Sequence, residues 1–327
     1  MNKTTTKAPK QAKATASSRP TQTRFAMADP ALMGTSLFRP LQRGSRNSRM
    51  VEINTEHRGR RLRIVSAYML GADDLSMFLA ILGLAGLLGK RLDTSRDSHL
   101  ADVLNGLDVR WSDGAGEEDF AAAVEQALGD TFLRLTTTTY ELIREAGLAD
   151  AGDAYHRCLD VLQRLRGVYY IDFGPEGTNA RQALSGPRQN LIGFGASEGD
   201  GGRLRIILNS RFAGAILGSQ FSRIDLTEAR QLGEVARILH TRLSVWIRPG
   251  ASWQAAVDTM ARWVYGDEAP TDAAKRKRRS AIRKALAEIG ALSGWQCFED
   301  KARAVVRVAR PQAGRNMLQQ MLPIDPF

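Results

Sequence analysis

The order of elements expected between residues 225 and 308 constrains the fold of this 327-residue chain more than any other feature. Asp225, with Glu228 three residues later, is a variant of the capping box and opens a long helix. Apolar residues then recur every three or four positions until Pro249 and Gly250 end the helix. They predict one buried stripe, made of Ala229, Leu232, Ala236, Leu239, Leu243 and Trp246.

Two further helices and a hairpin follow in the same region. The pattern predicts helices over residues 254–263 and 273–289, the second stopped by Gly290, and a hairpin of strands 295–298 and 305–308. Helix, helix, basic helix and hairpin is the order of a winged helix. A helix with a basic outer face can enter the major groove of DNA, which is about 12 Å wide. The order therefore predicts a winged-helix module that binds DNA.

The third of these helices carries a dense basic cluster. Seven of the ten residues from 275 to 284 are Lys or Arg, and no acid alternates with them at helical spacing. Their repulsion is expected to be uncompensated unless an anion is present, which favours a phosphate-facing surface over a merely solvated helix face. Ile282, Leu286 and Ile289 are expected to face the core, with Arg276, Arg279, Ser280 and Arg283 outward. The expected DNA contacts are Lys275, Arg276, Lys277, Arg278, Arg279, Ser280, Arg283 and Lys284, with Lys301 and Arg303 at the turn of the hairpin.

The first half of the chain begins with a hairpin and a buried helix. Residues 51–57 and 61–67 predict the hairpin. Asp73 or Asp74 is expected to cap a helix over 75–88 that is apolar on nearly every face. Further elements are expected as an irregular segment over 91–116, a helix over 117–128, a strand over 131–137, helices over 139–146 and 154–166, a strand over 168–173, and a hairpin of strands 191–194 and 204–208.

This order predicts a second winged helix, with residues 154–166 as a mildly basic reading helix. Its buried side is expected to hold Tyr155, Cys158, Leu159, Leu162 and Leu165. Further DNA contacts are expected from His156, Arg157, Gln163 and Arg164 on its other side.

The charge of the chain is concentrated at its N-terminus. The formal net charge is +11, and the first fifty residues hold ten Lys or Arg against one acid, Asp29. Large apolar residues are scarce in the first part of this segment, so it is expected to be disordered to about Ala28 and to add phosphate affinity or to be a passive leader. The expected class is α+β, with a disordered basic tail at 1–35, winged-helix domains at 36–210 and 211–311, and a C-terminal extension at 312–327.

No catalytic chemistry is expected. Two cysteines and four isolated histidines predict neither a disulfide framework nor a metal site. Residues 83–90 resemble a phosphate-binding loop but lack its first Gly and its Ser or Thr, so they are expected to be a buried helix. His240 and Arg242 resemble a recombinase fragment and are expected on a helix surface. We expect a cytoplasmic protein without cofactor, metal or transmembrane segment, because the longest apolar stretch, 77–88, is shorter than the roughly 20 residues that a bilayer requires.

Long ordered stretches of the sequence resemble RepC, the replication initiators of IncQ-type broad-host-range plasmids. The likeness covers roughly residues 36–311 and is strongest after residue 202. The segments that carry it include 37–44, 70–75, 202–209, 236–250, 276–286, 294–295 and 310–311.

The resemblance implies an initiator without a catalytic step. Such a protein would bind direct repeats (iterons) in double-stranded DNA at the vegetative origin, help to open adjacent A+T-rich DNA, and recruit a plasmid-encoded hexameric helicase. It also implies self-association through the first module. A tandem winged-helix transcriptional regulator without a helicase partner, and a structural nucleoid binder, are the alternatives.

Overall fold

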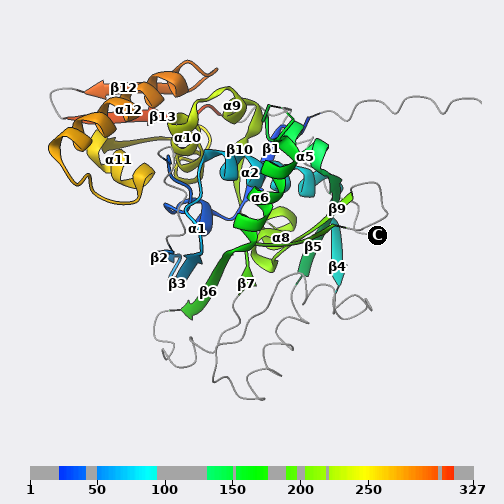
Figure 1. The fold of residues 1–327 in the computed structure, drawn as a ribbon. Helices are drawn as coiled ribbons and strands as arrows, with labels where there is room; N and C mark the ends of the chain where they lie inside the picture. The colour runs from blue at the N-terminus through cyan, green and yellow to red at the C-terminus, as the bar shows by residue number, and fades with distance from the viewer. Residues whose placement is uncertain are drawn as a thin grey trace, which may run out of the picture.

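The computed structural model describes residues 22–41, 50–93, 131–149, 152–175, 189–196, 203–218, 221–300 and 304–312. Helices alternate with small antiparallel sheets (Figure 1), which confirms the α+β class. Its buried apolar side chains, from β1 (Phe25–Ala28) to β13 (Val305–Ala309), form one main connected core. The expected helix over 117–128, the turn residues Lys301 and Arg303, and the C-terminal extension beyond residue 312 lie outside the described residues.

Two four-stranded antiparallel sheets hold the strands of the first half. One has the order β2-β3-β6-β7 and the other β4-β5-β9-β8. The expected hairpins are confirmed as β2 with β3 and β8 with β9. The strands are β2 (Val51–His57), β3 (Arg60–Ser66), β4 (Lys90–Asp93), β5 (Thr131–Thr138), β6 (Val168–Pro175), β7 (Gln189–Asn190), β8 (Ile192–Ala196) and β9 (Arg203–Leu208).

The strands that follow the two predicted helices of this half are divided between those sheets. After α5 (Thr139–Glu145) and α6 (Ala154–Arg166), β6 pairs with β3, whereas the β8–β9 hairpin pairs with β5. The residue patterns located β6, β8 and β9 correctly but missed β7 and also β4, whose residues 91–93 were expected to be irregular. A pattern of period two carries no information on which distant strand becomes the neighbour.

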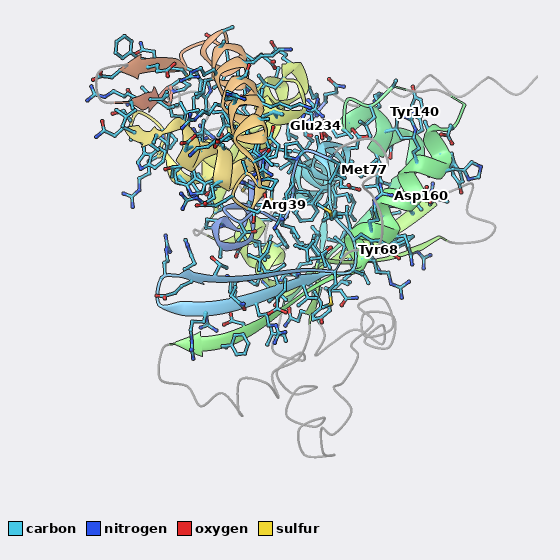
Figure 2. The ribbon with its side chains drawn as sticks, turned by 60° about the vertical axis from the view of Figure 1, so that its left-hand side comes forward. Arg39, Tyr68, Met77, Tyr140, Asp160 and Glu234 are labelled. Atoms are coloured by element: carbon cyan, nitrogen blue, oxygen red, sulfur yellow. The ribbon has the colours of Figure 1, made fainter. Side chains whose placement is uncertain are left out.

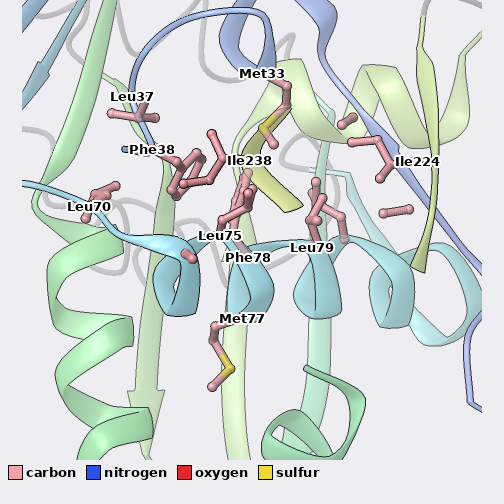
Figure 3. Close-up of a cluster of buried hydrophobic side chains, with 14 of the residues drawn as sticks. Met33, Leu37, Phe38, Leu70, Leu75, Met77, Phe78, Leu79, Ile224 and Ile238 are labelled. Carbon is pink, nitrogen blue, oxygen red and sulfur yellow. The ribbon is translucent and has the colours of Figure 1, made fainter. Parts of the chain in front are cut away.

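Helix α2 (Ala72–Leu88) lies at the centre of the core. It is buried on nearly every side, as its sequence predicts. Figure 3 shows Met77 on one side of it and Phe38, Leu79 and Ile238 on the other. The helix begins one residue after Gly71, whose backbone N–H donates to the Asp74 carboxylate at 2.7 Å, so Asp74 supports the start from inside the first turn rather than as the cap.

The N-terminal segment is ordered earlier than the sequence predicts. Strand β1 pairs with β10 (Ser222–Asp225), and α1 (Pro30–Met33) follows it with Asp29 as its cap. Disorder to about Ala28 is therefore wrong for the residues from 22 onward, and the tail of 1–35 is too long. Residues 25–33 are rich in apolar residues, and Ala26, Ala28, Leu32 and Met33 are buried in the core, while β1 gains its backbone hydrogen bonds from a strand that lies far along the chain.

The long helix expected from Asp225 is two helices. Helix α9 (Leu226–Gln231) ends before Gly233, and α10 (Glu234–Trp246) begins after it. The Gly233 N–H donates to the Glu288 carboxylate at 2.9 Å, so a distant acid stabilises the break. Both helices still bury the predicted stripe, apart from the half-buried Trp246.

The C-terminal module, defined here as residues 234–312, comprises α10 and the elements that follow it (Figure 1). Its three-stranded sheet has the order β11-β13-β12. The expectation of a helix from residue 254 is wrong at its start, because residues 252–256 pair with β13 and only then does the chain turn helical. The elements are β11 (Ser252–Ala256), α11 (Val257–Tyr265), α12 (Asp272–Gly290), β12 (Gln296–Asp300) and β13.

Residues of the N-terminal segment contact this module at α10 and at the end of α11. Arg39 lies against the end of α11 (Figure 2), where Gly266 has a φ of +80°. The positive φ favours glycine there, and a Cβ atom would displace the Arg39 guanidinium. The Leu41 N–H donates to the Glu234 carboxylate at 3.0 Å.

Candidate nucleic-acid interface

Helix α12 has one buried side and one basic exposed side. Thr271 caps it by accepting from the Ala274 N–H at 3.1 Å. The predicted inward stripe is confirmed, since Ile282, Leu286 and Ile289 are buried. The outer side carries exposed Arg276, Lys277, Ser280, Arg283 and Lys284, while Arg279 is half-buried.

Four of the seven cations in the basic cluster are paired with acids from other elements. Arg278 lies 3.0 Å from Asp267, and Lys275 lies 3.6 Å from Asp258. Arg279 also pairs with Asp258, and Arg283 pairs with Glu299 on β12 at 2.9 Å. The expectation of uncompensated repulsion is therefore wrong. The compensating acids come from α11, from the loop after it and from β12, where no helical spacing along α12 could indicate them.

The remaining three cations form an unpaired surface. Arg276, Lys277 and Lys284 are exposed and make no ion pair with any residue that the structure describes. Ser280 lies between them at helical spacing, so the four side chains share one outer stripe. We call these four residues the outer stripe of α12. It presents three positive charges and a hydroxyl to whatever approaches this side.

Arg279 and Arg283 are held by carboxylates in the same way. In each, Nε and Nη2 donate to the acid: Arg279 to Asp258 at 2.6 and 2.5 Å, and Arg283 to Glu299 at 3.1 and 2.9 Å. The hydrogen bond from Arg279 holds the pKa of Asp258 below its ordinary value. Because a guanidinium has five N–H groups in one plane, the Nη1 end of each arginine can still donate to a phosphate or a base edge.

The hairpin beside α12 presents an aromatic residue that the sequence analysis did not select. Phe298 on β12 is 69% exposed and lies opposite Arg307 of β13, which is also exposed. Side chains of a strand alternate between its two faces, so Phe298 lies on the same outer face as Gln296. This alternation is the sequence signal that could have predicted the exposure of Phe298.

The candidate DNA-contacting residues of α6 differ in their exposure. His156, Arg157 and Gln163 are exposed, as expected. Arg164 is not available for DNA, because its guanidinium donates to the Asp74 carboxylate at 2.8 Å and its side chain is only 14% exposed, while that of Asp74 is fully buried. Tyr155 is half exposed rather than buried, Leu159 is half-buried, and Val161 takes a core position beside Cys158, Leu162 and Leu165.

His240 and Arg242 are buried in α10, so their expected place on a helix surface is wrong. His240 and the Trp295 indole share the Glu228 carboxylate at 2.8 and 3.0 Å. Arg242 donates to the carbonyl oxygen of Phe38 at 2.9 Å, and burial, with Arg39 nearby, lowers its pKa to about 9. The reason is that α10 is covered on opposite sides, by residues around Phe38 and by those around Trp295.

Neither cysteine is a reactive thiol at neutral pH. Burial raises the pKa of Cys158 to about 12 and that of Cys297 to about 11, so both thiols stay protonated at neutral pH. Among the described residues, no group of three His, Cys, Asp or Glu side chains is placed to hold a metal ion. None of the described helices is long and apolar enough to cross a bilayer.

Comparison with known proteins decides the family. The sequence matches the family described as replication protein C (RepC) over residues 22–312, which is most of the chain. The chain belongs to the RepC family. RepC membership supports a role as a replication initiator that binds origin DNA.

Two solved structures of domains of RctB are similar to this chain. A crystal structure of domains 2 and 3 of RctB is 11% identical, with a TM-score of 0.49, and covers 88% of this RepC-family chain and 100% of its own. A second RctB structure, of the same two domains, is also 11% identical, with a TM-score of 0.45, and covers 90% and 99%. Comparison with proteins of curated function finds no match.

Proposed function

We propose that this protein is a plasmid replication initiator that binds direct repeats at the origin and reads them mainly with α12. The observation that carries the proposal is the outer stripe of α12, Arg276, Lys277, Ser280 and Lys284, exposed in a member of a replication protein family. Three cations that make no ion pair with any described residue, on a single helix face, favour a phosphate-facing surface over a merely solvated one.

The element order of the C-terminal module supports a winged helix. Helix α10, strand β11, helices α11 and α12, and the β12–β13 hairpin follow one another, and the three strands form one antiparallel sheet. In such a module the third helix enters the major groove and the hairpin reaches the flanking backbone. Lys301 and Arg303 at the hairpin turn, with the exposed Phe298, would then lie along the sugar–phosphate strand.

The cations of α12 divide into two roles in this proposal. Arg276, Lys277 and Lys284 contact phosphates and position the helix, since they extend without constraint. Arg279 and Arg283 present their Nη1 ends while Asp258 and Glu299 hold their Nε edges, which suits base readout. Lys275 and Arg278, paired near the N-terminus of the helix, contribute field rather than direct contacts.

The first module is proposed to add affinity. His156, Arg157 and Gln163 on the exposed side of α6 are its contact candidates, without Arg164. The proposal has further parts, which the resemblance of the sequence to IncQ initiators supports. They are domains at 36–210 and 211–311, a first winged helix, self-association, an IncQ-type origin and recruitment of a hexameric helicase. Binding and deformation of DNA are the whole mechanism proposed, with no catalytic step.

The test begins by footprinting the protein on the DNA next to its gene. Several identical direct repeats under the footprint are the expected result, whereas a single palindrome would favour a transcriptional regulator. Fluorescence anisotropy on the footprint and on scrambled DNA then compares the triple variant Arg276→Ala/Lys277→Ala/Lys284→Ala with Lys90→Gln, a control that loses an exposed charge on another sheet.

The triple variant should weaken binding to both DNAs by similar factors and lower the slope of log affinity against log salt by about 2.7. Arg279→Ala or Arg283→Ala should cost about 1–3 kcal/mol on the repeat and relax specificity. Unchanged binding of all three variants at moderate salt would refute the role of α12.

A further inference from the structure

The β2–β3 hairpin ends in a turn whose backbone conformation does not favour the arginine that stands there. The two strands pair as far as His57 and Arg60, so Arg58 and Gly59 alone form the turn. Both have positive φ, 54° and 73°, as a type I′ turn requires. Asn or Gly is the usual first residue of such a turn, and an arginine with positive φ is uncommon. A residue held against its backbone preference is a reason to look for a function of its side chain.

This turn carries two cations that form no ion pair with the residues that the structure describes. Arg58, Arg60 and Arg61 are all exposed. Arg60 pairs with Asp172 on β6 at 3.1 Å. Arg58 and Arg61 make no ion pair within the described part of the chain, although Arg61 faces Glu56 in the strand register. The turn therefore presents two unpaired guanidinium groups at the end of a two-stranded ribbon.

The position of the turn indicates that it contacts the same partner as α12. In Figures 1 and 2 the free end of the β2–β3 ribbon lies on the same side of the molecule as the C-terminal module. The large exposed apolar side chains of the described chain include none from residues 51–66, which argues against insertion into a lipid surface. A two-stranded ribbon with arginines at its end fits against or into a DNA groove.

We propose that the β2–β3 turn is a second DNA contact, in which Arg58 and Arg61 bind phosphates of the duplex beyond the segment that α12 occupies. The proposal rests on the proposed function of α12 and extends it. Its consequence is a longer binding site, with the two contacts on one continuous duplex. The ribbon adds affinity and register, and α12 supplies the sequence preference.

The test uses the full-length double variant Arg58→Asn/Arg61→Gln, because Asn tolerates positive φ and keeps the turn intact. The matched control is Lys90→Gln/Arg203→Gln, which removes two exposed cations from the β4-β5-β9-β8 sheet. Each protein is titrated on a short duplex limited to the segment that α12 protects, and on the same duplex extended at both ends with scrambled sequence.

On the long duplex the turn variant should lower the salt slope by about 1.8, two contacts at about 0.9 each. Its affinity deficit relative to the native protein should then shrink about twelvefold between 50 and 200 mM salt. On the short duplex it should match the native protein, and the control should match it on both.

The outcomes separate this inference from the function on which it rests. If the turn variant equals the control on both duplexes while Arg276→Ala/Lys277→Ala weakens both, the turn does not touch DNA and α12 does. If the turn variant loses equally on the short and long duplexes, its contact is not in the flank and the inference is wrong. If neither variant weakens binding, the proposed function itself fails.

Discussion

Replacing Asp258 by asparagine is the sharpest test of how α12 meets DNA. Asp258 is the shared partner of Arg279 and Lys275, and Asp258→Asn keeps its shape while removing its charge. The side chains of Asp258 and Arg279 are 35% and 40% exposed, so water screens their pair and it contributes little to stability. The variant should therefore fold, with a melting temperature close to that of the native protein.

The effect on DNA should be opposite for non-specific and specific binding. Loss of the carboxylate releases up to two cations for phosphate contact, which should steepen the salt slope by about 0.9–1.8 and tighten binding to scrambled DNA at low salt. Arg279 at the same time loses the acid that fixes its Nε edge. The ratio of repeat to scrambled affinity should therefore fall.

The assay is fluorescence anisotropy on repeat and scrambled duplexes at four salt concentrations. Asp160→Asn is the control, because Asp160 is exposed on α6 and lies away from α12 (Figure 2) while the charge change is identical. An unchanged slope and an unchanged ratio for Asp258→Asn would refute the reasoning, since the carboxylate would then neither compete with phosphate nor orient Arg279.

Two further variants test carboxylates that are hydrogen-bonded inside the fold. Arg164→Ala leaves the Asp74 carboxylate buried without its partner and should lower the free energy of unfolding in urea by about 3–5 kcal/mol. DNA affinity measured below the unfolding transition should not change, and the exposed control Gln163→Ala should change neither quantity. A loss of DNA binding without a loss of stability would contradict the ion-pair assignment. Burial raises the pKa of Glu228, but the hydrogen bonds from His240 and Trp295 outweigh it and leave the pKa below its ordinary value. Its stabilisation is thus complete above the unfolded pKa of about 4.3 and is lost as pH falls through the folded pKa. Glu228→Gln should therefore be less stable by about 1–2 kcal/mol at pH 7, with the difference disappearing under acid in pH-dependent melts; a constant difference would exclude this role.

The sequence alone determined the elements that local chemistry specifies. The basic helix, its inward Ile282, Leu286 and Ile289, both hairpins of the first half and the buried helix α2 follow from apolar period, turn residues and caps. These signals reside within one element, so they survive whatever the rest of the chain does. The resemblance to the RepC family also came from the sequence alone, through long stretches of matching residues.

Only the tertiary structure decided which polar groups are available. Asp258 and Glu299 neutralise Arg279 and Arg283 from other elements, and Asp74 holds Arg164 away from the surface. None of these three pairings has a sequence spacing that signals it. The same holds for the burial of Arg242. Charge type is written in the sequence, but the energy of a charge depends on distances of a few ångströms to groups far along the chain and on water exclusion, and the fold sets both.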